Sequence, residues 1–224
     1  MAQLKICGLM RPEDVLLCCA CGVDLIGFVV CYPKPVPWNL DIPRAQNLLS
    51  YCSGKSRSVV VTGGTPEQIL RRAEMLHPDF VQLHYRETPE ETHRLAAELH
   101  AMGIGCIKAI PVRSDGTPDM PGFATVACMA SRYAQTGADL LLLDARCPSA
   151  PASAGAILDA ALYRRVAQSA GIPVVLAGGL TVQNLPRVLL ETGAPFVDIL
   201  TGSESAPGVK DPHRIRRLRD LTQT

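Results

Sequence analysis

The chain lacks the features that mark membrane, secreted and nucleic-acid-binding proteins. No apolar run reaches the roughly 18 to 20 residues of a membrane-spanning helix, and the first residues lack the apolar stretch of a secretory signal. Neither sign of charge is in excess, since 22 Lys and Arg stand against 21 Asp and Glu. The resulting net charge of +1 gives no argument for nucleic acid or an anionic membrane as a partner. We therefore expect a cytoplasmic protein that binds neither nucleic acid nor membranes.

The chain also lacks a disulfide framework, although it contains nine cysteines. Their odd number and their positions inside apolar patterns are typical of reduced thiols. Cys18 and Cys21 have the C-x-x-C spacing of zinc ligands, but no second pair follows at the distance of a zinc site. Both lie in a predicted helix, so we interpret them as small buried residues and predict no metal site.

What the sequence does have is a regular alternation of short apolar runs and amphipathic segments. Such alternation is typical of consecutive βα units rather than of two separate domains. The predicted strands are Gln3 to Cys7, Leu25 to Val30, Ser58 to Val61, Phe80 to Leu83, Gly105 to Ala109, Leu140 to Leu143, Val174 to Ala177 and Val197 to Leu200.

The segments between these strands begin and end with residues that favour helix termini. Thr65-Pro66-Glu67-Gln68 and Thr88-Pro89-Glu90-Glu91 each place a capping hydroxyl, a first-turn proline and a capping-box partner in order. Asp211-Pro212 opens the last predicted helix in the same manner. Glycines mark helix ends at Gly22, Gly103, Gly137, Gly171 and Gly193.

Eight βα units without a further domain-sized segment predict a single (β/α)8 TIM barrel spanning residues 1–224. A doubly wound sheet is the alternative, because periodicity alone does not show closure. In a barrel, the chemistry belongs to residues at the carboxyl ends of strands and in the loops that follow. The candidates there are Cys7, Cys31 to Lys34, Gly63-Gly64, His84, Asp144 to Arg146, Gly178-Gly179 and Thr201 to Glu204.

Glycine-bearing loops follow the seventh and eighth predicted strands. Gly178-Gly179 precedes one helix, and Thr201-Gly202-Ser203 precedes another. Glycine lets backbone N–H groups approach an anion, and a helix N-terminus adds the positive end of its dipole. Two such loops, at the strands where this fold commonly holds phosphate, predict a phosphate site.

Cys7 and Asp144 end the first and sixth predicted strands, so both are expected to project into one barrel mouth. A thiolate and a carboxyl group on opposite sides of a substrate form an acid/base pair. Lys5 shares the side of the strand on which Cys7 lies, so we expect it to stabilise the thiolate. Packing is the alternative for Cys7, whereas a buried Asp144 carboxylate needs a polar partner.

Several blocks along almost the whole chain stand out, in this order: Lys5-Ile6-Cys7-Gly8-Leu9, Arg11-Pro12-Glu13-Asp14, Gly27-Phe28-Val29, Tyr32-Pro33-Lys34, Val81-Gln82-Leu83-His84, Leu141-Leu142-Leu143-Asp144, Leu176-Ala177-Gly178-Gly179-Leu180 and Glu204-Ser205-Ala206-Pro207-Gly208-Val209-Lys210-Asp211. Together these blocks resemble the phosphoribosylanthranilate isomerase family of tryptophan biosynthesis. The first and the last block are particularly specific to that family.

The resemblance implies an Amadori-type rearrangement that converts an N-linked aminoaldose phosphate into an aminoketose phosphate without a cofactor. It implies that Cys7 is the general base that removes the C2′ proton and that Asp144 is the general acid that protonates the furanose ring oxygen. We expect a small phosphorylated molecule as partner, in a monomer or homodimer. The residues expected to bind this substrate are Lys5, Lys34, Gln82, His84, Arg146, Gly178, Gly179, Gly202 and Ser203.

The chain departs from the family at positions that concern substrate recognition. Pro37 stands where the family has the arginine that holds the anthranilate carboxylate, and proline does not replace a guanidinium. Ala152 to Gly155 replace a glycine-rich loop, Leu200-Thr201 replace paired serines, and Tyr85 replaces a glycine. These changes leave the acid/base pair in place. The candidate replacements for the arginine are Lys34, Arg11 and Arg146.

Other functions are therefore retained beside the biosynthetic isomerase. One is a relative of the family that acts on a substrate without the anthranilate carboxylate. Another is a non-catalytic barrel that binds a ligand, which the lost arginine favours and the retained Cys7 and Asp144 oppose. A lyase or aldolase is the third, and it would use a strand-end lysine such as Lys108 as a Schiff-base former.

Overall fold

The computed structural model describes residues 1–52, 54, 56–113, 115–144 and 160–223. The strands in this part of the chain are β1 Gln3–Ile6, β2 Leu25–Val29, β3 Arg57–Thr62, β4 Phe80–Leu83, β5 Gly105–Pro111, β6 Leu140–Asp144, β7 Val174–Ala177, β8 Phe196–Ile199, β9 Glu204–Ala206 and β10 Val209–Lys210. The α-helices are α1 Pro12–Ala20, α2 Ile42–Leu49, α3 Pro66–Leu76, α4 Pro89–Ala101, α5 Val126–Ala134, α6 Ala160–Ala170, α7 Leu185–Thr192 and α8 Pro212–Gln223.

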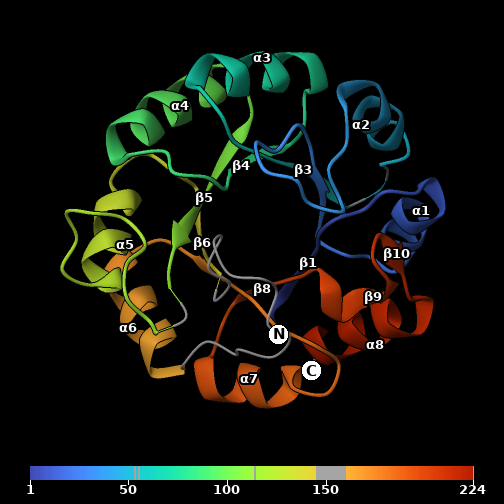
Figure 1. Ribbon diagram of the computed structural model, residues 1–224. Coiled ribbons are helices and arrows are strands. Elements are labelled where there is room, and N and C mark those ends of the chain that lie inside the picture. Colours follow the sequence, from blue (N-terminus) through green and yellow to red (C-terminus); the bar gives the residue numbers. More distant parts are fainter. Residues whose placement is uncertain (53, 55, 114, 145–159, 224) are drawn as a thin grey trace.

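Strands β1 to β8 form a closed parallel barrel in sequence order, and the helices surround it (Figure 1). β1 pairs with both β2 and β8, which closes the sheet. This closure confirms the predicted (β/α)8 barrel and excludes the doubly wound sheet, which has two open edges. None of the helices in the described ranges is long and apolar enough to cross a membrane.

The element boundaries agree closely with those predicted from the sequence. Every barrel strand begins and ends within two residues of its predicted limits. Thr65 and Thr88 each cap a helix and complete the predicted capping box, with Gln68 and Glu91 as partners. The predicted helix-end glycines all have positive φ, which is the left-handed conformation that glycine adopts without strain.

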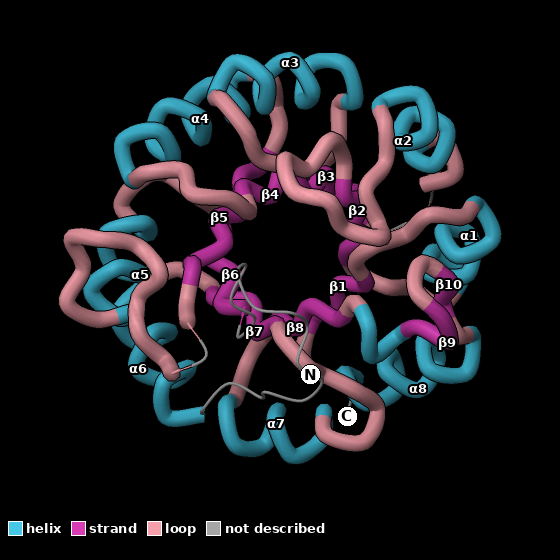
Figure 2. The backbone as a smooth tube through the Cα atoms, viewed as in Figure 1, coloured by secondary structure: helices cyan, strands magenta, loops and turns pink. Residues whose placement is uncertain are grey.

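Side chains alternate along the strands between two apolar layers, and Figure 2 shows the strands as an inner ring inside the ring of helices. One layer fills the barrel interior and includes Val29, Val59, Ile107, Leu142 and Val175. The other layer packs between the strands and the helices. Burial on both faces explains why the strands read as continuous apolar runs.

At the amino-terminal ends of the strands, which we call the floor, aspartates repeat one contact. Each precedes an even-numbered strand and accepts a hydrogen bond from a backbone N–H of the strand before it: Asp24 from Leu4 at 2.8 Å, Asp79 from Ser58 at 2.7 Å and Asp139 from Cys106 at 2.7 Å. These contacts satisfy N–H groups at the start of the sheet and join neighbouring strands.

Candidate active site

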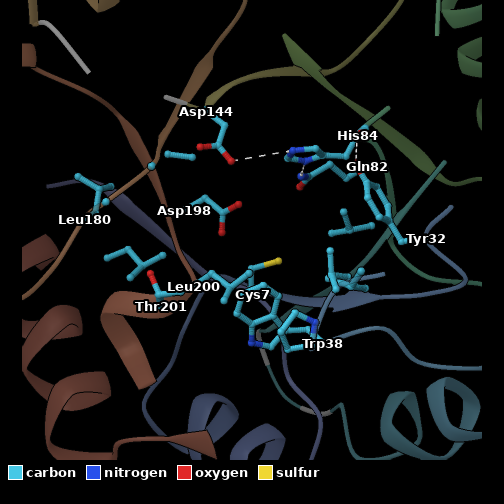
Figure 3. A pocket seen from close by; sticks show the side chains of 18 of the residues that line it. Cys7, Tyr32, Trp38, Gln82, His84, Asp144, Leu180, Asp198, Leu200 and Thr201 are labelled. Atoms are coloured by element: carbon cyan, nitrogen blue, oxygen red, sulfur yellow. Dashed lines mark hydrogen bonds and ion pairs between the residues drawn. The ribbon is translucent and has the colours of Figure 1, made fainter. Parts of the chain in front are cut away.

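A cavity of about 430 Å³ lies at the carboxyl-terminal ends of the strands, which we call the mouth. Its volume is in the range of small-molecule sites. Apolar side chains from several strands and from the loop after β2 form most of its wall. The polar side chains that line it include Lys34. Figure 3 labels the others, which are Cys7, Tyr32, Gln82, His84, Asp144, Asp198 and Thr201.

Cys7 follows β1 directly, and its sulfur points into the cavity (Figure 3). A Cβ atom at position 27 would lie 2.9 Å from Cys7 Sγ, so Gly27 leaves the room that the thiol occupies. Burial raises the pKa of the Cys7 thiol above its ordinary value, while the nearby ammonium groups of Lys5 and Lys210 oppose this shift. The thiol is therefore placed for chemistry but needs cationic support to ionise.

Lys5 and Asp198 lie opposite each other in the pairing of β1 with β8, and Lys5 Nζ is 2.8 Å from Asp198 Oδ2. Burial disfavours the ammonium form of Lys5, but the Asp198 carboxylate and Cys7 raise the pKa of Lys5 above its ordinary value. Lys5 is fully buried and is not among the cavity-lining residues. It therefore acts on Cys7 and Asp198 from inside the barrel, behind the cavity wall.

Asp198 was missed by the sequence analysis. It lines the cavity, and its Oδ1 atom is buried without a hydrogen-bond partner among the described residues. The signal was present, because Asp198 interrupts the apolar strand β8 just as Asp144 ends the apolar strand β6. The same burial argument that singled out Asp144 applies to it.

Asp144 faces the cavity from the side opposite Cys7, with His84 and Gln82 next to it (Figure 3). His84 Nε2 is 3.9 Å from Asp144 Oδ2, and Gln82 Nε2 is 2.8 Å from His84 Nδ1. Because the amide nitrogen donates, Nδ1 accepts and the neutral imidazole carries its hydrogen at Nε2, toward Asp144. The Tyr32 hydroxyl donates to the His84 carbonyl at 2.7 Å, which fixes the loop after β4.

Gly178 and Gly179 line the cavity just after β7, both with positive φ. The side-chain amide of Asn184 donates to the Gly179 carbonyl at 2.9 Å and so fixes the peptide orientation in this turn. The loop after β8 lies directly against it, since a Cβ atom at Gly202 would be 1.9 Å from the Leu180 carbonyl oxygen. Only glycine permits this approach of the two loops.

Gly202 and Ser203 themselves are not among the described residues that line the cavity. Ser203 is fully buried, and its hydroxyl donates to the Leu200 carbonyl at 2.6 Å. Leu200 and Thr201 form the cavity wall at this point instead. The predicted phosphate residues thus divide into two that face the cavity and two that shape the loop behind it.

The loop after β2 supplies a cation to the cavity wall. Lys34 lines the cavity, and its Nζ lies 5.7 Å from the centre of the Tyr85 ring. Pro37 also lines the cavity but has neither charge nor donor. Arg11 does not line it and pairs with Glu13 at 3.0 Å. The predicted positions Arg146 and Ala152 to Gly155 lie outside the described residues.

Trp38, the one tryptophan of the chain, is a second functional candidate that the sequence analysis missed. It lines the cavity, and its indole lies against Gly8, where a Cβ atom would be 3.0 Å from the ring. The indole nitrogen donates to Glu204 Oε1 at 2.7 Å, across 166 positions of sequence. No local pattern reveals a contact between segments so far apart.

Lys108 does not take part in the cavity. It is fully buried, its Nζ is 2.6 Å from Glu87 Oε2, and it lies 5.4 Å from the ring of Tyr133 on α5. Its side chain therefore points into the layer between the sheet and the helices. This position leaves the lyase or aldolase alternative without the strand-end lysine that it requires.

Cys18 lies within α1, as the sequence predicts, whereas Cys21 follows the last residue of this helix as its C-cap and is only partly buried. Cys18 is buried, which is the environment expected of a packing residue. Among the described residues, no group of three or more His, Cys, Asp or Glu side chains could hold a metal ion.

A thiol and a carboxyl group that face one cavity at a barrel mouth, beside glycine loops after β7 and β8, are the features of a (β/α)8-barrel enzyme with acid/base chemistry. Comparison with known families identifies the family within this class. Residues 4–220 match the model of the N-(5′-phosphoribosyl)anthranilate (PRA) isomerase family, and the chain belongs to that family.

Individual relatives agree with this family over nearly their whole length. The N-(5′-phosphoribosyl)anthranilate isomerase of Nitrobacter winogradskyi is 35% identical over 218 residues, covering 95% of this chain and 89% of that protein. A phosphoribosylanthranilate isomerase solved with reduced 1-(o-carboxyphenylamino)-1-deoxyribulose 5-phosphate is 26% identical, with a TM-score of 0.79 and coverage of 100% and 99%. Monomers generated from the dimeric isomerase of Thermotoga maritima are 25% identical, with a TM-score of 0.78 and the same coverage.

Proposed function

We propose that this chain catalyses the isomerisation of N-(5′-phosphoribosyl)anthranilate, an Amadori-type rearrangement in tryptophan biosynthesis. The observation that carries the proposal is that Cys7 and Asp144 face one cavity from opposite sides, in a member of the PRA isomerase family. The family membership and the position of Lys108 favour this activity over a non-catalytic barrel and over an aldolase. A single domain of residues 1–224 and a cytoplasmic location are part of the proposal.

In the proposed reaction, Asp144 gives a proton to the furanose ring oxygen, and the C1′–O bond breaks to leave an iminium group at C1′. The Cys7 thiolate then removes the C2′ proton, and the C2′–H electron pair forms the C1′–C2′ double bond of an enolamine. Tautomerisation of this enolamine gives the aminoketose. Substrate and product are isomers, so general acid/base catalysis accounts for the rearrangement without an external oxidant or reductant.

Neighbouring side chains prepare each of the two groups. The Lys5 ammonium favours the thiolate form of Cys7, and its own charge is maintained by Asp198 at 2.8 Å. His84 directs its Nε2 hydrogen toward Asp144, which orients the carboxyl group and stabilises the charge left after proton transfer. Gln82 holds that imidazole tautomer. Lys5, Gln82 and His84 thus act mainly through the two catalytic residues.

We assign the two charged ends of the substrate to different loops of the mouth. Gly178 and Gly179 offer backbone approach for the phosphate, and Gly202 and Ser203 hold the second loop against them. Lys34 takes the anthranilate carboxylate in place of the family arginine. Among the described residues that line the cavity, it is the one lysine, and none of them is an arginine. The apolar loop around Pro37 and Trp38 then faces the aromatic ring.

The direct test is turnover of phosphoribosylanthranilate by the purified chain, followed by growth complementation of a tryptophan auxotroph that lacks this isomerase. We expect turnover and growth with the unmodified chain and neither with Cys7→Ser. No turnover of this substrate, or turnover that Cys7→Ser leaves unchanged, would contradict the proposal. Analytical ultracentrifugation of the same preparation distinguishes the monomer from the homodimer.

A further inference from the structure

The segment from Glu204 to Asp211 is one of the sequence blocks that carry the resemblance to the family, yet none of its side chains lines the cavity within the described residues. Its central contact is an ion pair between Lys210 of β10 and Glu204 of β9, with Nζ and Oε1 3.1 Å apart. Both side chains are almost completely removed from solvent, with exposures of 0% and 5%. A buried ion pair is a costly feature that does not by itself argue for stability, so its position demands a reason.

Lys210 touches the main chain of the proposed base. Its Nζ donates to the Cys7 carbonyl oxygen at 2.6 Å and approaches the Leu200 carbonyl oxygen at 3.5 Å. Cys7 and Leu200 directly follow β1 and β8, so one ammonium group holds the exits of two adjacent barrel strands. The backbone N–H of Lys210 also donates to Asp14 on α1 at 3.3 Å, which fixes the hairpin against the barrel.

Glu204 connects the same ammonium to the cavity wall. Its Oε1 atom accepts from Lys210, from the indole nitrogen of Trp38 at 2.7 Å and from the Gly208 N–H at 3.1 Å. A single carboxylate oxygen therefore joins the loop after β2 to the β9–β10 hairpin, and Lys210 connects both to the end of β1. Figure 3 shows the Trp38 side chain close to Cys7 at the edge of the cavity.

We propose that the buried Glu204–Lys210 pair positions Cys7 and Trp38, and that the Lys210 ammonium stabilises the Cys7 thiolate through space. Lys210 is thus a positioning residue for the base and does not touch the substrate. This inference rests on the proposed role of Cys7. It gives the β9–β10 hairpin a function that its position outside the cavity wall does not reveal.

The electrostatic part follows from the charges that face Cys7. Lys5 approaches from β1, Asp198 from β8 and Lys210 from the hairpin, while β2 contributes Gly27 and no side chain. Burial raises the pKa of Cys7, and Lys210 is one of the two cations that act against this rise. Because Asp198 offsets part of the effect of Lys5, the smaller effect of Lys210 adds to the stabilisation of the thiolate that remains.

The chain contains a matched control on the other side of the barrel. Lys108 and Glu87 form an ion pair with an Nζ to Oε2 distance of 2.6 Å and exposures of 0% and 3%. Loss of either lysine leaves a buried glutamate without its cation, so both losses are expected to destabilise the fold. Lys108 does not contact Cys7, so only the loss of Lys210 is expected to change the base.

The experiment measures alkylation of Cys7 by iodoacetamide between pH 6 and pH 10, a range that brackets the ordinary thiol pKa of about 8.5. Because the chain has nine cysteines, the Cys7 peptide is quantified by mass spectrometry. The variants are Lys210→Met, Glu204→Gln and the control Lys108→Met. We expect Lys210→Met to slow alkylation at pH 8 by roughly tenfold and to lower kcat more than it changes KM. We expect Lys108→Met to leave the alkylation profile unchanged.

Glu204→Gln distinguishes electrostatics from a purely structural role. It keeps an oxygen acceptor for Trp38 and Lys210 but removes the charge that neutralises the ammonium, so we expect faster alkylation at low pH. Changes in the same direction in Lys210→Met and Glu204→Gln, or an equal loss in Lys108→Met, would overturn the inference. If Lys210→Met does not fold, Glu204→Gln still decides between the two roles.

Alkylation is independent of turnover, so this test separates the inference from the proposed function. If the chain does not isomerise phosphoribosylanthranilate but alkylation slows in Lys210→Met and accelerates in Glu204→Gln, the role of Lys210 is supported and the proposed activity is contradicted. If the chain isomerises the substrate but Lys210→Met leaves the alkylation of Cys7 unchanged, the activity is supported and the role of Lys210 is contradicted.

Discussion

Aspartates occupy both ends of the barrel, and their partners differ. At the floor, Asp24, Asp79 and Asp139 accept hydrogen bonds from backbone N–H groups of neighbouring strands. At the mouth, Asp144 and Asp198 line the cavity, and Asp198 Oδ1 is buried with no partner among the described residues. Aspartate thus completes the hydrogen bonding of the sheet at the floor, and it faces the cavity at the mouth.

The difference shows how one fold separates stability from chemistry. A floor carboxylate satisfies a backbone donor, so its removal exposes an unpaired N–H group in the folded state. At the mouth, the Oδ1 atom of Asp198 has no hydrogen-bond partner among the described residues, so it can accept a hydrogen bond from a substrate. We therefore expect mutations at the two ends to affect different measurements.

The largest expected contrast is between Asp144→Asn and Asp139→Asn. Asparagine has the shape of aspartate but no acidic proton, so Asp144→Asn should lower kcat by roughly 10²- to 10⁴-fold with little change in melting temperature. Asp139→Asn keeps an oxygen acceptor for the Cys106 N–H, so its kcat should equal that of the unmodified chain. Steady-state kinetics at 25 °C measure both. An Asp144→Asn variant within tenfold of the original rate would place the general acid elsewhere.

A second contrast concerns the carboxylate end of the cavity, where Lys34→Met should raise KM for phosphoribosylanthranilate by roughly 10- to 100-fold through loss of a charge-assisted contact. Pro37→Arg should lower KM, because it restores a guanidinium at the family position. The isosteric floor variant Asp139→Asn serves as the reference for unaltered binding. An unchanged KM in both Lys34→Met and Pro37→Arg would show that another cation holds the carboxylate.

The phosphate loops provide the third contrast, through Gly202→Ala and Gly171→Ala. The new Cβ at position 202 would lie 1.9 Å from the Leu180 carbonyl, whereas nothing lies within 4 Å of the corresponding atom at Gly171. Both variants strain a helix or loop, but only Gly202→Ala should separate the two loops and raise KM, by roughly tenfold. Isothermal titration with inorganic phosphate gives an independent measurement. Equal phosphate affinity in the two variants would remove the loops from the binding site.

The fourth prediction concerns pH. The pKa of Cys7 is raised above its ordinary value by burial, so at neutral pH most of the thiol is protonated. The thiolate fraction increases by about tenfold per pH unit below the pKa. Turnover also depends on the proton of Asp144, so the thiolate is followed by alkylation of Cys7 with iodoacetamide. The alkylation rate should rise by about tenfold per pH unit from pH 6.5 to 8.5, and a profile that levels off within this range would contradict the raised pKa.

The smallest effect on activity is expected at the floor itself. Asp79 accepts from both the N–H and the hydroxyl of Ser58, at 2.7 and 2.8 Å. Asp79→Ala should lower the free energy of unfolding by about 1 to 3 kcal/mol, because a backbone donor loses its partner. Urea titration measures this loss, and kcat/KM at 25 °C should not change. A fall in kcat/KM without a fall in stability would break the separation between the two ends.

The sequence predicts the fold well because its signals are local. Thr65, Thr88 and the helix-end glycines fix boundaries within a few residues of themselves, and the strands are short apolar runs. Eight such units leave closure as the simplest arrangement, and the pairing of β1 with β8 confirms it. Nothing in these patterns requires knowledge of contacts between distant segments.

The candidate site is predicted less completely, and the distance between partners explains the gap. Cys7, Asp144, Gly178 and Gly179 follow from their places at strand ends, and all line the cavity. The contacts of Trp38 with Glu204 and of Lys210 with Cys7 join segments at opposite ends of the chain, which only the folded structure brings together. Asp198 is different, because the burial argument used for Asp144 would have identified it.

One consequence of the Lys5–Asp198 and Lys210–Cys7 contacts concerns the order of events during synthesis. These partners are separated by 193 and 203 positions, so the thiol leaves the ribosome long before either group that completes its surroundings. Until β8 docks, Cys7 is an ordinary cysteine in a growing chain. Closure of the barrel therefore places Cys7 in the cavity and completes its charged surroundings in the same event.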